Sequence, residues 1–97
     1  ITIDEKAAKK FLIAEAAKPM RYLVEKLTAL DEFSEIKIEQ TFAAILQELG
    51  LSMGQLAQPV RVALTGSAVS PGIHEVIAVL GKERTLKRLR AALIHLA

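Results

Sequence analysis

The sequence of 97 residues carries a formal net charge of +2, with 52% hydrophobic residues, 25% charged residues and no cysteine. This length and balance predict one soluble globular domain and exclude a disordered chain, and no apolar run reaches the roughly 18 residues that a membrane-spanning helix needs. The absence of cysteine excludes disulfides, thiolate metal ligands and cysteine nucleophiles, and it fits a reducing compartment, so we expect a cytoplasmic protein.

Helical signals dominate the first third of the chain. Thr2 with Glu5 forms a capping-box pattern, which predicts a helix from about Ile3 to Ala16. Pro19 suits the first turn of a second helix. The apolar residues of that helix recur every three or four positions and define a core-facing side: Met20, Leu23, Val24, Leu27 and Leu30.

A charged stretch over residues 31–37 predicts a loop before a third helix. That helix also has an apolar face, formed by Ile38, Phe42, Ile45, Leu46 and Leu49. It should end at Gly50, because glycine tolerates the left-handed backbone that helix ends favour.

Proline and glycine divide the next segment. Ser52 with Gln55 is a second capping pattern. Pro59 lacks a backbone N–H and crowds the preceding turn, so it should either kink the helix that follows Ser52 or begin a new one. We favour a new helix from Pro59 to Thr65, which Gly66 ends.

The dipeptide Ser70-Pro71 is a helix-start pattern, in which serine caps the helix and proline occupies its first turn. It predicts a helix from Pro71 to Leu80 that ends at Gly81, followed by a last helix from about Lys82 to Leu96. Taken together, these elements predict an all-α fold, a compact bundle of five to seven short helices with no sheet.

Catalytic and metal-binding constellations are missing from the pattern. His74 and His95 are far apart in the sequence, with no carboxylate at zinc-ligand spacing. Asp31, Glu32 and Glu35 lie in a polar stretch without an apolar pocket to raise a carboxyl pKa, so a solvated turn is the better interpretation. We therefore expect no catalytic residue, no metal site and no cofactor in this chain.

Positive charge is concentrated in the second half, since acidic residues outnumber basic ones in residues 1–50 and the reverse holds in residues 51–97. Such an asymmetry indicates that one surface meets a polyanion. The last helix carries candidate phosphate contacts: Lys82, Arg84, Lys87 and Arg88. The alternative is a solvated face with local ion pairs.

Arg61 and the helix start at Ser70 form a candidate binding site. A helix start presents free backbone N–H groups and the positive end of the dipole to a phosphate or a base carbonyl. If the chain folds back after Gly66, the Arg61 guanidinium reaches the same place, where it can stack on a base and donate two hydrogen bonds in one plane. Single-stranded RNA offers such bases. The alternative is a serine-capped helix with a surface arginine.

The run from Gln58 to Leu89 resembles the C-terminal anticodon-binding domain of bacterial glutamyl-tRNA synthetases. The residues that carry the resemblance, in order, are Arg61, Ala63-Leu64-Thr65-Gly66, Ser70-Pro71, Glu75, Leu80-Gly81 and Glu83-Arg84. The resemblance implies that residues 1–97 are a single helical anticodon-binding domain, a fragment of a larger class I enzyme whose catalytic domain lies upstream.

By that resemblance, Arg61 and Ser70 bond base edges of the anticodon, while Pro71 and Ile73 supply an apolar wall. The residue after the apolar position is often aromatic in that family, whereas here it is His74, which weakens a stacking role at that position. The expected partners are the anticodon loop of tRNA(Glu) and the remaining domains of the parent synthetase.

The parent would attach glutamate to tRNA(Glu) with ATP and Mg²⁺ bound in its catalytic domain. Neither class I signature, His-Ile-Gly-His or Lys-Met-Ser-Lys-Ser, occurs in these 97 residues, so the fragment alone is expected to be inactive. Two other functions stay open. One is a helical protein-interaction or scaffold domain that does not bind RNA. The other is a helix-turn-helix DNA binder, which the apolar character of residues 71–80 disfavours.

Overall fold

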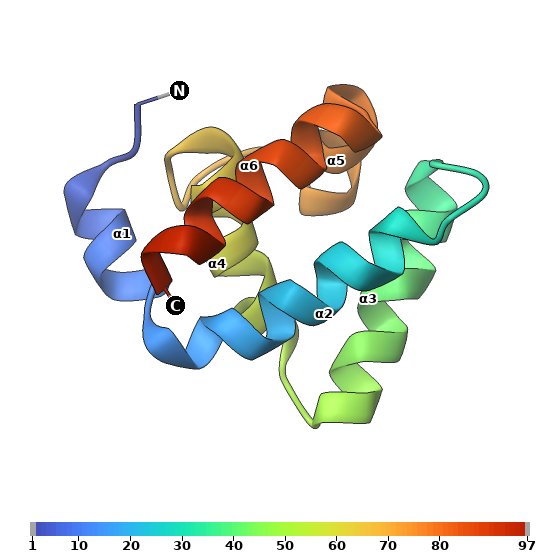
Figure 1. Cartoon of the computed structure of the whole chain (residues 1–97), viewed down its shortest axis with the longest axis horizontal. Coiled ribbons are helices and arrows are strands. Elements are labelled where there is room, and N and C mark those ends of the chain that lie inside the picture. Colours follow the sequence, from blue (N-terminus) through green and yellow to red (C-terminus); the bar gives the residue numbers. More distant parts are fainter. Residues whose placement is uncertain (1, 97) are drawn as a thin grey trace.

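A computed structural model of the chain describes residues 2–96. Within them the chain forms six α-helices and one 3₁₀ turn and no strand: α1 (Glu5–Phe11), η1 (Ala14–Ala16), α2 (Ala17–Thr28), α3 (Glu35–Leu49), α4 (Met53–Thr65), α5 (Ile73–Leu80) and α6 (Lys82–Leu96). In Figure 1, α2 and α6 cross the near face, α4 lies behind them, and α1 and α3 lie at opposite ends of the long axis. The predicted all-α bundle is confirmed.

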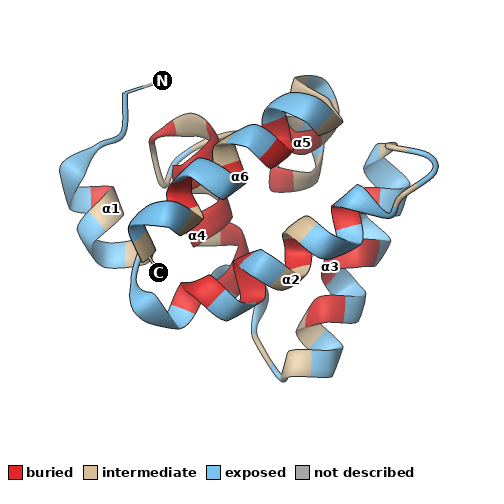
Figure 2. Cartoon of the chain, viewed as in Figure 1, coloured by how far each residue is buried: buried red, intermediate tan, exposed pale blue. Residues whose placement is uncertain are grey.

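One hydrophobic core joins the helices α2 to α6. Its largest fully buried side chains include Phe42, Met20, Leu23, Leu27, Ile38, Ile45, Leu56, Leu64, Ile77 and Leu89. Figure 2 shows the buried residues on the inward faces of the helices and the exposed ones outside. The apolar faces predicted for α2 and α3 are therefore confirmed, because a period of three and four places these side chains on one side of each helix. No described helix combines the length and the apolar character that crossing a membrane requires.

The first helix is shorter than predicted, and Thr2 does not cap it. Asp4 is the N-cap, and its Oδ2 accepts a hydrogen bond from the Ala7 backbone N–H at 3.1 Å. The Asp4 N–H donates to the Gly66 carbonyl at 2.8 Å. This tertiary contact holds the backbone of residues 2–4 outside the helix, so the sequence pattern at Thr2 is overruled by packing against the end of α4.

The loop before α3 is also shorter than predicted. Ser34 caps α3, and its hydroxyl accepts from the Lys37 N–H at 3.3 Å, so the helix already includes residues 35–37. The end of α3 agrees with the prediction, since Gly50 follows with a φ of 66°.

The predicted break at Pro59 is wrong, because α4 is continuous from Met53 to Thr65. The capping box of Ser52 and Gln55 is present and starts the helix. A proline inside a helix removes its own N–H bond to the carbonyl four residues earlier. Here the Pro59 ring is itself buried, as are Leu56 and Val60 on the same helix, and this burial offsets the lost hydrogen bond.

Candidate nucleic-acid interface

Arg61 and Ser70 meet at the carboxyl end of α4. The Arg61 Nε–H donates to the Ser70 hydroxyl at 2.7 Å, and Arg61 Nη1 donates to Gln58 Oε1 at 3.0 Å. Arg61, Ser70 and Gln58 are all half-buried. The folding back predicted between Arg61 and Ser70 is thus present, and it makes one cluster from a helix and the loop that follows it.

The turn between these two residues is held by its own polar side chains. Gly66 ends α4 with a φ of 81°, a left-handed conformation that side chains other than glycine rarely adopt. The Thr65 hydroxyl lies 2.8 Å from the Arg61 carbonyl and accepts from the Ser67 N–H at 3.2 Å. The Ser67 hydroxyl accepts from the Val69 N–H at 3.1 Å. These short-range bonds set the path that returns Ser70 to Arg61.

Ser70 does not cap α5, contrary to the prediction. The N-cap is Gly72, which has no side-chain cap bond, and α5 starts at Ile73. The Ser70 hydroxyl accepts from Arg61 and donates to the Pro71 carbonyl at 2.9 Å. Because α5 begins at Ile73, Ser70 lies two residues before the N-cap, and its hydroxyl is bonded to Arg61 and Pro71 instead.

Pro71 and Ile73 lie in different environments. Pro71 is exposed and lines a small apolar groove together with Glu75, Val76, Val79 and Leu80. Ile73 is only 2% exposed and belongs to the core. An exposed apolar wall made by both residues is therefore not what the structure shows: the Ile73 side chain anchors the start of α5, and Pro71 alone of the two faces outward.

His74 packs against the core. Its ring lies edge-on to Phe42, with ring centroids 4.9 Å apart and an interplanar angle of 76°. Its buried Nε2 has no hydrogen-bond partner. His74 is half-buried on α5, and this placement agrees with the weakened stacking role expected at that position.

The four basic residues expected to contact phosphates fall into two pairs. Lys82 donates to the Leu30 carbonyl at 3.0 Å, and Arg88 donates to the Leu64 carbonyl at 2.7 Å, so both are half-buried and bonded within the chain. Arg84 and Lys87 are exposed. The Arg88 bond also places α6 beside the last turn of α4, because its acceptor Leu64 follows Arg61 by one helical turn.

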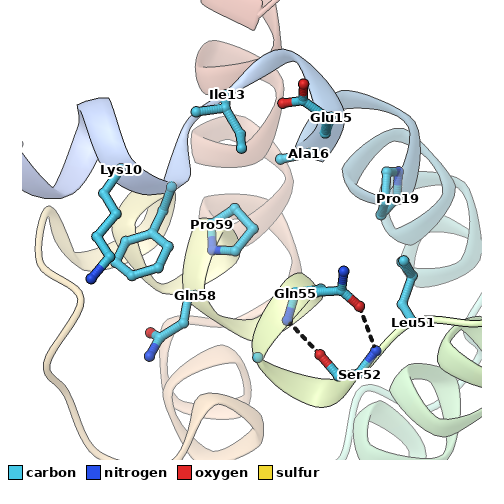
Figure 3. A pocket seen from close by; sticks show the side chains of 12 residues that line it. Lys10, Ile13, Glu15, Ala16, Pro19, Leu51, Ser52, Gln55, Gln58 and Pro59 are labelled. Atoms are coloured by element: carbon cyan, nitrogen blue, oxygen red, sulfur yellow. Dashed lines mark hydrogen bonds between the residues drawn. The ribbon is translucent and has the colours of Figure 1, made fainter.

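A separate groove of about 450 Å³ lies between the end of α1, the η1 turn and the first half of α4. Its walls are mainly apolar, and they include Phe11, Ile13, Pro19 and Pro59 (Figure 3). Gln58 lies at its rim, but Arg61 and Ser70 do not line it. Within residues 2–96 no group of three or more His, Cys, Asp or Glu side chains is arranged to hold a metal ion.

The sequence-based reasoning missed Gln58 as a member of the cluster. Residues three apart on a helix are neighbours, so Gln58 and Arg61 share a face once α4 is continuous. The predicted break at Pro59 put Gln58 outside the helix that carries Arg61 and hid this relation.

Comparison with known proteins identifies the family of the chain. The family model described as "Anticodon binding domain" matches residues 1–93 of the 97. The chain belongs to the anticodon-binding domain family. The family assignment supports RNA recognition, and nothing in the comparisons favours a protein-interaction domain.

Relatives of this anticodon-binding domain are glutamate–tRNA ligases. The domain is 53% identical over 90 residues to the ligase of Thermodesulfovibrio yellowstonii and 52% identical over 93 residues to that of Syntrophobacter fumaroxidans. These alignments cover 93% and 96% of the chain but only 19% and 20% of the relatives, so the chain spans about a fifth of their length.

A solved structure shares the fold. The crystal structure of a glutamate tRNA ligase from Elizabethkingia meningosepticum in complex with its amino acid superimposes with a TM-score of 0.91 at 32% identity. The match covers 99% of this chain and 19% of that one. A glutamate-tRNA synthetase from Elizabethkingia anophelis gives a TM-score of 0.79 at 29% identity, over 96% of this chain and 18% of that one.

Proposed function

We propose that this chain is the anticodon-recognition module of a glutamate–tRNA ligase and that it binds the anticodon loop of tRNA(Glu). The observation that supports the proposal is the cluster in which Arg61 lies 2.7 Å from Ser70, in a chain that belongs to the anticodon-binding domain family. Both side chains are half-buried, so each keeps part of its surface open to a ligand.

The chemistry of the cluster suits a nucleotide. A guanidinium has five N–H donors, and the two bonds to Ser70 and Gln58 leave three for a ligand. Carbonyl oxygens and ring nitrogens of unstacked bases, and phosphate oxygens, are matching acceptors. Pro71 lies next to Ser70 and is exposed, so a base held by Arg61 has an apolar surface beside it.

Phosphate contacts add affinity that does not depend on base identity. Arg84 and Lys87 are the exposed candidates on α6. Lys82 and Arg88, which are bonded to backbone carbonyls, act mainly through their charge. We place the anticodon stem along this helix.

The parent protein that we propose attaches glutamate to tRNA(Glu) in the cytoplasm, using ATP and Mg²⁺ bound by its catalytic domain. The partners of the chain are then the anticodon loop of tRNA(Glu) and the other domains of that ligase. The role that we propose for the chain is binding, which the match to the anticodon-binding domain family supports.

A binding experiment with Arg61→Ala tests the proposal. Affinity for tRNA(Glu) is measured by filter binding and compared with an anticodon-altered tRNA(Glu) and an unrelated tRNA. Loss of a base-reading arginine typically costs about 1–3 kcal/mol, so the affinity for tRNA(Glu) should fall by about 5- to 150-fold. The preference over the anticodon-altered tRNA should fall with it.

Arg21→Ala is the matched control, because Arg21 is an exposed arginine on α2 and the substitution removes the same charge. It should leave the preference for the anticodon unchanged. Circular dichroism establishes that both variants fold. If a folded Arg61→Ala variant keeps the affinity and preference of the unchanged chain, the proposed site is wrong.

A further inference from the structure

We propose that Gln58 is a positioning residue of the RNA-binding site, which together with Ser70 holds the Arg61 guanidinium in one orientation. This inference rests on the RNA-binding function proposed above. No role follows for Gln58 from the family resemblance, and the inference comes from the side-chain contacts alone.

Two hydrogen bonds at different nitrogens carry the argument. Gln58 Oε1 accepts from Arg61 Nη1 at 3.0 Å, and the Ser70 hydroxyl accepts from Arg61 Nε at 2.7 Å. A single contact leaves a planar group free to turn about that contact, whereas two contacts at separate atoms fix its plane. An arginine side chain has many rotamers, and a group already held in its bound orientation loses less conformational freedom when the ligand arrives.

The Ser70 contact is itself fixed. The single hydroxyl proton of Ser70 is donated to the Pro71 carbonyl at 2.9 Å, which leaves the oxygen lone pairs to accept from Arg61. The cluster therefore runs from Gln58 on α4 through Arg61 to the loop before α5. Gln58 fixes the helix side of the guanidinium and Ser70 fixes the loop side.

The orientation of the Gln58 amide follows from the same chemistry. A guanidinium offers donors only, so the amide must turn its oxygen toward Arg61 and its NH₂ group away. The groups that the cluster leaves for a ligand are then the remaining N–H donors of Arg61. Such a site fits a base edge or a phosphate that presents acceptors.

The acceptors around Arg61 carry no charge, so they do not neutralise the guanidinium. The side chains that accept from Arg61 at Nε and Nη1 are both neutral, a serine hydroxyl and a glutamine amide. They orient the guanidinium and leave its positive charge for an anionic ligand.

A double-mutant cycle tests the proposal. Gln58→Leu keeps a similar volume and removes the Oε1 acceptor, and it is made in the unchanged chain and in the Arg61→Ala variant. The probe is an RNA hairpin with the anticodon stem and loop of tRNA(Glu), and affinity is measured by fluorescence anisotropy. Loss of one positioning hydrogen bond should weaken binding about 3- to 10-fold in the unchanged chain. In the Arg61→Ala background the same substitution should change the affinity by less than about 2-fold, since Gln58 acts through Arg61.

A second readout follows Arg61 without RNA. The Arg61 Nε–H signal in an NMR spectrum should exchange faster with solvent in Gln58→Leu than in the unchanged chain. Gln47→Leu, which alters an exposed glutamine on α3, should change neither the exchange nor the affinity. Gln58→Ala is measured in parallel, so that a folding defect of one variant does not decide the result.

The outcomes separate this inference from the function on which it rests. If Arg61→Ala weakens RNA binding but Gln58→Leu and Gln58→Ala do not, the positioning role is wrong and the proposed function stands. An equal loss from Gln58→Leu with and without Arg61 also overturns the positioning role. If Arg61→Ala leaves binding unchanged, the proposed Arg61 site is wrong and this inference fails with it.

Discussion

Replacement of Gly66 by alanine should destabilise the fold and disturb the binding cluster together. Gly66 is buried, has a φ of 81° and ends α4 just before the turn that leads to Ser70. A Cβ added there would lie 2.1 Å from the Thr2 carbonyl oxygen. Because the obstacle is backbone, no side-chain rotation relieves it, and residues 2–4 must move away from α4.

Two effects set the magnitude. A side chain other than glycine in the left-handed region costs about 1–2 kcal/mol. Movement of residues 2–4 breaks the 2.8 Å hydrogen bond from Asp4 N to the Gly66 carbonyl, and a typical intramolecular hydrogen bond contributes about 0.5–1.5 kcal/mol. Gly66→Ala should therefore lower the free energy of unfolding by about 1.5–3.5 kcal/mol.

Other glycines of the chain provide the controls. Gly50 also has a positive φ, 66°, but nothing lies within 4 Å of its added Cβ, so Gly50→Ala should cost only the backbone strain. Gly54 lies inside α4 in open space, and Gly54→Ala should stabilise the chain by about 0.5–1 kcal/mol.

Urea unfolding followed by circular dichroism measures the three variants, with the midpoint and slope giving the free energy of unfolding. Equal destabilisation by Gly66→Ala and Gly50→Ala would show that the contact with Thr2 contributes nothing and would refute the reasoning. Gly66→Ala should also weaken RNA binding, because the turn that it distorts carries Ser70 to Arg61, whereas Gly50→Ala should not.

Two further predictions concern charge. The hydrogen bond that Tyr22 donates to Glu48 raises the pKa of Tyr22 above its ordinary value of 10.0, with smaller contributions from desolvation and the negative charges of Glu48 and Glu25. Because folding raises this pKa, the stabilisation from the hydrogen bond is present below pH 10 and is lost as the pH rises above it. Glu48→Gln removes the carboxylate, so it should lower the Tyr22 pKa measured in a tyrosinate absorbance titration. An unchanged titration curve would contradict the contact. Replacing both Arg84 and Lys87 by glutamine should make the affinity for tRNA less dependent on salt. The slope of log affinity against log salt concentration should fall by about 1 for each phosphate contact that α6 loses. An unchanged slope would show that α6 is not part of the RNA interface.

The helices of the first half were largely predictable, because their signals are local. In α2 and α3 the apolar period of three and four residues matches the buried side chains, and Gly50 ends α3 as expected. The errors came where contacts from distant residues compete with a local pattern. Asp4 is bonded to the Gly66 carbonyl, which keeps residues 2–4 out of the first helix, and Pro59 is accommodated because its ring is buried.

The candidate site shows the same division. Arg61 and Ser70 were candidates from their residue types, the family resemblance favoured them over a surface arginine and a capped helix, and the structure brings them together. The partner Gln58 was missed because the helix was expected to break at Pro59. The exposed role expected for Ile73 disagreed with its burial, since the orientation of α5 against the core depends on packing that no single residue encodes.

By itself the sequence determined the helical class and most helix ends, because helix periodicity, caps and glycine stops act over a few residues. Tertiary structure alone decided how these groups are used. It turned the Ser70 hydroxyl from a helix cap into an acceptor for Arg61, bonded Lys82 and Arg88 to carbonyls of other helices, and left Arg84 and Lys87 exposed. The physical reason is that a polar side chain forms its hydrogen bonds with the donors and acceptors that lie near it, and bonds that involve a charged group are the stronger ones. Which groups lie near it is determined only by the packed fold.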